Sequence, residues 1–391
     1  MIRRGVATFT LDTGRCPRWL FDRMVRLGRS MVEVIVAEYG PDEFIERISD
    51  PVWFQSLGTV LAFDWNASGL TTILTAALKE SIRGMEDRLG LYICGGKGKA
   101  SLRTPGEITA WGEKLALPEG SVEGLVYNSR MVAKVDSSLI QDGYSIYHHS
   151  FFFSGNGLWA VVQQGMNTSS QTARRYHWFS KKATDMVCEP HSGIASQHAG
   201  RIGSAFSDRC LNLAAKESGK TRDLSTEMVN TSYAGLMSDM RILRKHSGSL
   251  SRMAAVRRGD TEDIFLELRD REFTWHPVAD EDFTYNKYLE KILWSVCEQK
   301  PENYEKLVAM KGVGAKTVRA LSLVSEVIYG AGPSYRDPAR YSFAHGGKDA
   351  TPYPVDTKTY DRSIAFFMNV ARKMNVSPEE KNGIIKKILT M

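Results

Sequence analysis

The chain has 391 residues, of which 42% are hydrophobic, and this is enough for two or three domains around a sizeable core. Lysine and arginine exceed aspartate and glutamate by 51 to 45, and the resulting formal net charge of +6 permits nucleic-acid binding without requiring it. The five cysteines have no paired spacing, which disfavours a zinc knuckle and a disulfide framework, and no apolar run reaches the ~18 residues of a membrane span. We therefore expect a cytoplasmic protein with no membrane contact.

The first eighty or so residues are predicted to be mostly helical. Apolar side chains recur at helical spacing over residues 17–39, and Gly40 and Pro41 follow directly after the end of that run. Further helices are expected over residues 41–50 and 71–82.

Strands are predicted from residue 90 onward, where β-branched and aromatic residues become frequent. The candidate strands are a short run beginning at Gly90 and the segments 124–136, 144–153 and 158–166. Asn156 and Gly157 separate the last two segments, and Asn-Gly between apolar runs is the strongest short-range signal of an antiparallel hairpin, because both residues tolerate positive φ. With these two residues as the turn, His149 is expected opposite Gln164, with both side chains on one face.

Residues beyond about 200 are predicted to be mainly helical. Helical spacing is found in the segments 228–246, 286–299, 303–310, 315–330 and 377–391. The basic stretch 241–258 is either a solvated surface or a phosphate-facing patch. We therefore expect an α+β protein, with an N-terminal mixed α/β domain over residues 1–200 that contains the antiparallel hairpin, and a mainly helical C-terminal domain over residues 201–391.

The octapeptide MKGVGAKT at residues 310–317 joins two predicted helices through a glycine-rich turn. Gly312 and Gly314 lack a Cβ, so the backbone can adopt positive φ and can approach a ligand closely. The N–H groups at the start of the second helix have no partner inside it and lie at the positive end of its dipole, which suits a phosphate oxygen. The residues expected at this phosphate site are Lys311, Gly312, Val313, Gly314, Lys316, Thr317 and Arg319. The alternative is an ordinary helical hairpin with a glycine cap.

The string KLVAMKGVGAKT resembles the helix-hairpin-helix motif of DNA repair proteins, whose pattern is L-x-G-V-G-x-K-T. The resemblance places the motif within residues 302–330 and implies binding to the DNA backbone. It extends to helix-hairpin-helix DNA glycosylases such as endonuclease III, because Val355-Asp356-Thr357 matches their V-D-T. By this resemblance, Lys316 matches the lysine that forms a Schiff base in bifunctional glycosylases, and Asp356 matches the aspartate that assists base loss. The forty positions between them are about twice the family's spacing, and no cysteine after Cys297 is present for an iron–sulfur cluster.

The whole chain, from PRWLFDRM and AFDWNASG through AVVQQGMN and ARRYHW to YSFAHGGKD and PYPVD, is similar to an archaeal and bacterial family catalogued as a domain of unknown function. That resemblance implies nucleic-acid processing, with nuclease activity beside a RecQ-type helicase.

A metal-dependent nuclease needs carboxylates, sometimes with histidine, around one or two divalent ions. The candidate metal ligands are Asp136, Asp142 and His149. Gln164 and His149 would orient water or the metal, and Lys134 would support the phosphate, so these five residues are the catalytic candidates. The alternative is that such polar residues are structural, and the nuclease signature Pro-Asp…Glu-x-Lys is missing.

Arg174 and Arg175 are followed by Tyr176, His177 and Trp178. Arginine neutralises phosphate and aromatic rings stack unpaired bases, so this stretch suits single-stranded nucleic acid. The alternative is an edge strand with a buried Trp178.

These observations predict a protein that binds and cuts DNA, single-stranded or bubble-containing, with magnesium or manganese as cofactor. A DNA glycosylase or lyase that uses Lys316 and Asp356 is one alternative, and a non-catalytic adaptor that recruits a helicase is another. A phosphate-loop ATPase is disfavoured, because Lys99 is followed by Ala100 rather than by serine or threonine.

Overall fold

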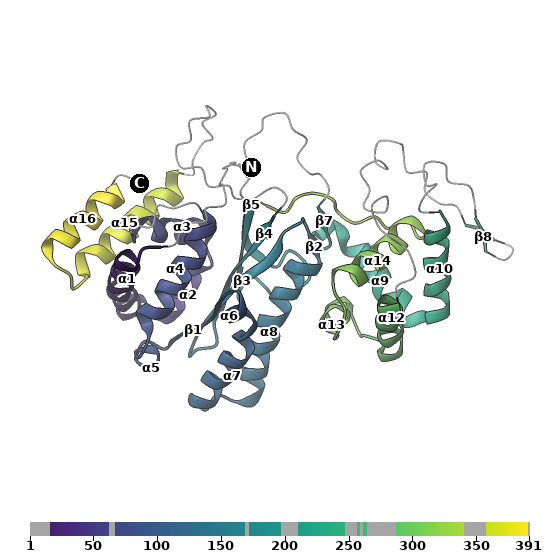
Figure 1. The fold of residues 1–391 in the computed structure, drawn as a ribbon, viewed down its shortest axis with the longest axis horizontal. Coiled ribbons are helices and arrows are strands. Elements are labelled where there is room, and N and C mark those ends of the chain that lie inside the picture. Colours follow the sequence, from purple (N-terminus) through teal and green to yellow (C-terminus); the bar gives the residue numbers. More distant parts are fainter. Residues whose placement is uncertain are drawn as a thin grey trace.

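The computed structural model describes residues 16–61, 67–168, 172–196, 210–246, 256–258, 261–263, 287–339 and 357–389. A five-stranded antiparallel sheet runs through the middle of the molecule, and helices cover both of its faces (Figure 1). The expected α+β class is therefore confirmed. None of the helices in these ranges is long and apolar enough to cross a membrane.

Four helices cover one face of the sheet. They are α1 (Arg18–Tyr39), α2 (Pro41–Ile48), α3 (Pro51–Val60) and α4 (Ala67–Ile82), and the short α5 (Glu86–Leu89) follows. The helices predicted over 17–39, 41–50 and 71–82 are confirmed. Gly40 ends α1 with φ +85°, and Pro41 starts α2 at its first position, where a missing N–H costs nothing. Asp50 caps α3, because its carboxylate accepts the N–H groups of Val52 and Trp53.

The central sheet has the strand order β1-β3-β4-β5-β6, with every neighbouring pair antiparallel. Its strands are β1 (Leu91–Lys97), β3 (Ser145–Ser154), β4 (Trp159–Asn167), β5 (Thr172–Phe179) and β6 (His191–Ser196). β5 is paired on both sides, so it is an interior strand rather than the edge strand of the alternative reading. Trp178 on it is buried, as that reading expected.

Residues 124–136 form a helix rather than the predicted strand. They belong to α8 (Glu119–Ser138), which follows α6 (Lys99–Leu102) and α7 (Thr104–Lys114). The buried side chains Leu125, Ser129, Val132 and Val135 recur three or four positions apart, which is the helical period, although valine is frequent in strands. In this segment the helical spacing of the buried side chains was a better guide than the preference of valine for strands.

The turn between β3 and β4 has three residues rather than two, and this moves the register. Ser154 N–H donates to Leu158 O at 2.9 Å, and Gly157 adopts φ +86° at the end of the loop. His149 therefore pairs with Gln163 instead of Gln164. Because side chains alternate between the two faces, a shift of one residue places His149 and Gln164 on opposite faces of the sheet.

The described residues beyond 210 are mainly helical, as predicted. β2 (Ile140–Gln141) pairs with β7 (Leu211–Asn212), and a second short pair is formed by β8 (Val256–Arg258) and β9 (Thr261–Asp263). The helices are α9 (Gly219–Thr231), α10 (Tyr233–His246), α12 (Lys287–Gln299), α13 (Tyr304–Ala309), α14 (Ala315–Val327), α15 (Thr357–Lys373) and α16 (Pro378–Leu389), with a 3-10 turn, η1 (Lys216–Ser218), before α9.

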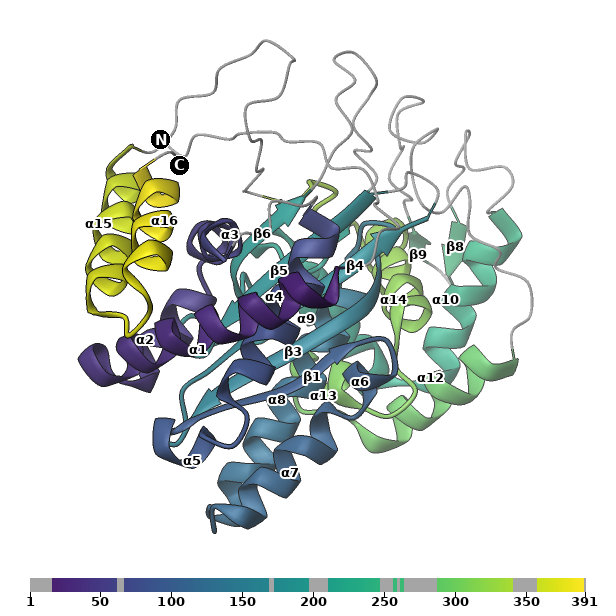
Figure 2. The ribbon, with the colours of Figure 1, turned by 60° about the vertical axis from the view of Figure 1, so that its left-hand side comes forward.

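Two hydrophobic cores lie on the two faces of the sheet. One joins the sheet to α8 and to the helices α9 to α14, and the other joins it to α1 to α4 and to the C-terminal pair α15 and α16. Phe367 of α15 stacks on Trp53 of α3 with 5.4 Å between ring centroids, and Figure 2 shows the C-terminal pair beside α1 and α2. Each of the two hydrophobic cores therefore contains residues from before and from after residue 200.

Candidate functional site

The glycine turn, residues 310–314, connects α13 to α14. Asn303 caps α13 by accepting the Lys306 N–H at 2.9 Å. Gly312 adopts φ +88°, and a Cβ there would lie 2.3 Å from Ile292 Cδ1 of α12. Both the conformation and the lack of space require glycine at this position.

Gly314 is the N-cap of α14 and has a different environment. Its φ of −150° is extended backbone, no side chain caps the helix, and a Cβ at this position would meet no atom within 4 Å. The first N–H groups of α14 have no acceptor inside the helix, so they lie at an uncapped end beside open space. This is the arrangement in which a helix N-terminus accepts an anion.

The other residues predicted at the phosphate site divide into two groups. Lys311 and Lys316 are exposed on either side of Gly314. Val313 and Thr317 are buried in the core, and the Arg319 Nε donates to Gln141 Oε1 at 2.6 Å. The two lysines and the backbone of the two glycines are therefore the part of the prediction that lies at the surface.

Lys134 and Gln141 hold the glycine turn in place. Lys134 Nζ donates to Met310 O at 2.5 Å, and Gln141 Nε2 donates to Ala315 O at 2.9 Å. Burial lowers the pKa of Lys134 from its ordinary value. Lys134 thus positions the turn from α8, which differs from its predicted contact with phosphate.

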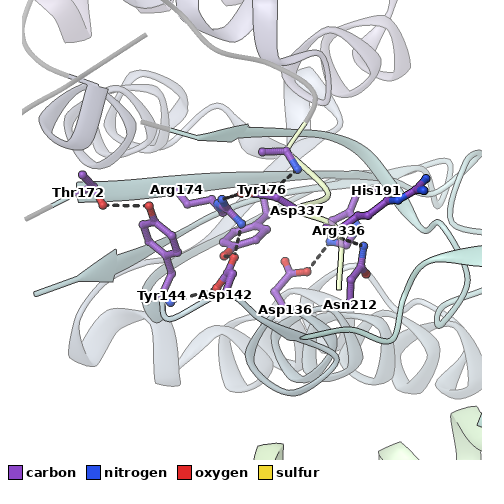
Figure 3. A network of polar contacts seen from close by, with 11 residues as sticks. Asp136, Asp142, Tyr144, Thr172, Arg174, Tyr176, His191, Asn212, Arg336 and Asp337 are labelled. Carbon is purple, nitrogen blue, oxygen red and sulfur yellow. Dashed lines mark hydrogen bonds and ion pairs between the residues drawn. The ribbon is translucent and has the colours of Figure 1, made fainter. Parts of the chain in front are cut away.

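Asp136 lies in the interior between α8 and the sheet. Its Oδ2 accepts hydrogen bonds from Gln163 Nε2 and from Trp178 Nε1, the latter at 2.9 Å, and its Oδ1 is bonded to His191 Nε2. The residue is fully buried, and Figure 3 shows it beside His191 under the strands. Both carboxylate oxygens are already used by protein donors.

His149 belongs to the same buried chain of contacts. Its Nδ1 lies 2.8 Å from Gln163 Oε1, and its Nε2 lies 3.0 Å from the Ser129 hydroxyl. Because an amide oxygen only accepts, Nδ1 carries the proton and Nε2 accepts from the serine. Burial lowers the pKa of His149, which favours this neutral form.

Asp142 and Arg174 form a buried ion pair next to Asp136 (Figure 3). Asp142 Oδ2 accepts from Arg174 Nη1 at 2.6 Å and from the Tyr176 hydroxyl at 2.7 Å. Arg174 Nη2 lies 2.6 Å from Asp337 Oδ2. The side chain of Arg174 is 1% exposed and that of Asp337 is 32% exposed. Arg174 therefore binds two carboxylates in the interior instead of forming the predicted contact surface.

Arg175, Gln164 and His148 lie on the opposite face of the sheet, toward α3 and α4. Arg175 is buried over the ring of Phe54 and donates to Gln55 Oε1 at 3.2 Å, and burial lowers its pKa to about 9. Gln164 Nε2 donates to the Tyr147 hydroxyl at 2.5 Å. The predicted catalytic set is thus divided between the two faces.

The predicted metal ligands Asp136, Asp142 and His149 do not form a metal site in this arrangement. Within the described ranges, no group of three or more His, Cys, Asp or Glu side chains that could hold an ion is present. The carboxylates accept hydrogen bonds from protein donors, so these residues do not fit magnesium or manganese. Asp356 of the glycosylase alternative lies outside the described residues.

Sequence reasoning missed His191 and Asp337, which contact Asp136 and Arg174. His191 is 55 positions from Asp136, and Asp337 is 163 positions from Arg174. No local pattern marks contacts at such separations. A three-residue loop would have predicted the pairing of His149 with Gln163, but the contact of Asp136 with Gln163 joins α8 to the hairpin and has no local signal.

One family model matches residues 5–355, and it describes a protein of unknown function, DUF763. No curated protein and no solved structure matches the chain. The match covers most of the sequence, which agrees with the resemblance to a domain-of-unknown-function family. The chain therefore belongs to the DUF763 family.

Proposed function

We propose that the protein binds DNA, and that α13, the glycine turn and α14 act as a helix-hairpin-helix that holds a backbone phosphate. The observation that carries this proposal is the uncapped N-terminus of α14 at Gly314, which opens to free space between the exposed Lys311 and Lys316. In this proposal, backbone N–H groups and the two ammonium groups contact the same phosphate.

Binding of this kind reads the sugar-phosphate chain and not the bases. Contacts made by backbone N–H groups and lysines carry no sequence information, so affinity should vary little with base sequence and should fall as salt rises. Arg174 and Arg175 take no part, because their guanidinium groups are buried. Lys134 and Gln141 contribute by keeping the turn in its conformation.

Lys316→Gln is expected to weaken binding to every DNA sequence by a similar factor. Removing one lysine–phosphate contact should reduce the slope of log affinity against log salt by roughly 0.7 on single strands and 0.9 on duplex DNA. Fluorescence anisotropy at several salt concentrations measures both quantities. Lys182→Gln serves as the control, because Lys182 is an exposed lysine on the turn after β5. Equal slopes for both variants would contradict the role of Lys316.

Cleavage of the bound DNA is a second candidate function, and one observation favours it. Gln141, which bonds to Ala315 at the start of α14, is followed directly by Asp142 of the carboxylate network. Asp142 is buried against Arg174, and Arg174 also contacts Asp337, whose side chain is 32% exposed. The described carboxylates do not fit an ion, so no metal-dependent step is assigned to them.

The purified protein is expected to cut single-stranded and bubble DNA in assays run with and without magnesium or manganese, and Asp337→Asn is expected to lose cleavage while retaining binding. Gel electrophoresis of end-labelled DNA with wild type and variant measures this. Binding without cleavage of any substrate would leave only an adaptor role, and the RecQ-type helicase predicted above is then the partner to test. A borohydride-trapped adduct through Lys316 would point to a glycosylase or lyase.

A further inference from the structure

Helix α12 carries an exposed stripe of aromatic and basic side chains directly beside the glycine turn. The α12 stripe consists of Lys287, Tyr288, Lys291 and Trp294. Tyr288 is 65% exposed and Trp294 is 53% exposed, although rings of this size are usually more buried. Lys287, Lys291 and Trp294 follow the i, i+4, i+7 spacing of one helical face, and Tyr288 lies three residues before Lys291. Glu298 follows at the far end of the stripe.

The stripe is held rigidly because the other side of α12 is part of the core. Ile292, Leu293, Val296 and Cys297 are buried there. Ile292 fills the space that a side chain at Gly312 would need, and the Tyr288 hydroxyl would lie 3.7 Å from a Cβ at the same glycine. Tyr288 is therefore adjacent to the backbone of the turn, and Trp294 lies about 9 Å further along the helix axis.

We propose that the α12 stripe stacks unpaired DNA bases of the strand whose phosphate is held by the glycine turn. This inference rests on the proposed function and narrows its ligand to DNA with a single-stranded segment. The two rings offer surfaces on which bases can stack, and the two lysines carry a charge opposite to that of the DNA phosphates. Proteins that bind single-stranded DNA combine these two features. Isolated exposed aromatic residues need no function, but these two lie on one helix, and Tyr288 adjoins the glycine turn.

The proposal separates base contacts from phosphate contacts, so it can be tested with a matched pair of oligonucleotides. One is a thymidine oligonucleotide, and the other has the same length and charge but abasic sugars throughout. Wild-type protein is expected to bind the thymidine oligonucleotide at least about tenfold more tightly, because each stacked base contributes roughly fivefold or more. Equal affinity for both oligonucleotides would overturn the inference and would leave the proposed phosphate site standing.

The double variant Tyr288→Ala/Trp294→Ala is expected to bind both oligonucleotides with the affinity that wild type shows for the abasic one. Its affinity for fully paired duplex should be unchanged. Tyr288→Phe/Trp294→Phe should restore the preference for bases, since the phenyl ring still stacks. Trp19→Ala on α1 is the control for an exposed aromatic residue, at 60% exposure, that lies elsewhere.

Two results would contradict the inference. One is a double variant that keeps the preference for bases, and the other is a double variant that loses duplex and abasic binding as well. A wild-type protein that binds none of these ligands would instead show that the proposed function itself is wrong. Circular dichroism and thermal melting of each variant show that both rings were removed from a folded protein.

Discussion

Asp136→Ala is expected to lower the free energy of unfolding by about 3 to 5 kcal/mol. The fully buried carboxylate accepts hydrogen bonds from Gln163 and Trp178 and is bonded to His191, and alanine would remove this acceptor from the Trp178 indole N–H, from His191 Nε2 and from one N–H of the Gln163 amide, which keeps its bond to Val132 O. Urea unfolding followed by tryptophan fluorescence measures the loss.

Asp136→Asn is the matched variant, and its loss should be much smaller. The asparagine oxygen can still accept from Gln163 and Trp178, and its amide can donate to His191 in the tautomer with an unprotonated Nε2. If Asp136 served mainly as a metal ligand, the alanine variant would instead keep its stability and lose a metal-dependent activity. A stable Asp136→Ala protein would therefore contradict the structural role described above.

Acid should destabilise the protein through its buried histidines, and His148 is one that can be tested by itself. Burial lowers the pKa of His148 from 6.5 to about 3, and His149 and Lys97 add to this shift. Its Nε2 is bonded to Thr75 and Ser150, while Nδ1 is buried with no hydrogen-bond partner in the part of the chain that the structure describes. The second proton, which makes the ring positively charged, would thus be both desolvated and unpaired.

The direction of the effect follows from which state binds the proton. Between pH 6.5 and about 3 the unfolded chain carries a proton on His148 that the folded protein excludes. Stability is therefore fully present above pH 6.5 and falls on acidification by about 1.4 kcal/mol per pH unit for this one group. Urea unfolding between pH 7 and 4.5 measures the slope, and His148→Gln should reduce it by about one proton. An identical slope in wild type and variant would contradict the prediction.

The parts of the fold that follow from local pattern were predicted well. Helical spacing and the Gly-Pro boundary located α1 and α2, and Asn-Gly located the hairpin between β3 and β4. Loop length was harder, because the same glycine serves a two-residue and a three-residue loop. The difference of one residue in loop length decides whether His149 pairs with Gln164 or with Gln163.

The parts that depend on distant residues could not be predicted in this way. The packing of Phe367 against Trp53 joins the C-terminal helices to the N-terminal core across more than 300 positions, and the contact between Arg174 and Asp337 is also long-range. The valine-rich segment of α8 was read as a strand from residue preference, although its buried positions follow the helical period.

The glycine turn was the most informative segment for the proposed site. The sequence identified both glycines and both exposed lysines, because each has a direct physical reason to be in such a turn. The sequence did not distinguish the roles of the two glycines. Gly312 is required by positive φ and by Ile292, whereas Gly314 has open space around it, and this difference is visible only in the packing of α12 against the turn.

The most direct test of the account is the affinity of Gly314→Val for oligonucleotides as a function of salt. Valine suits the extended backbone at this position, and its Cβ would meet no atom within 4 Å, so the fold should persist, with a cost to the N-cap of about 1 kcal/mol at most. Its methyl groups would stand where a phosphate approaches the first N–H groups of α14. Gly155→Val, in the equally open β3–β4 turn, is the control.

We predict that Gly314→Val binds single-stranded and duplex DNA at least about tenfold more weakly than wild type, with a shallower salt dependence, while Gly155→Val is unchanged. A folded Gly314→Val protein that holds both kinds of DNA with wild-type affinity and wild-type salt dependence would contradict the account.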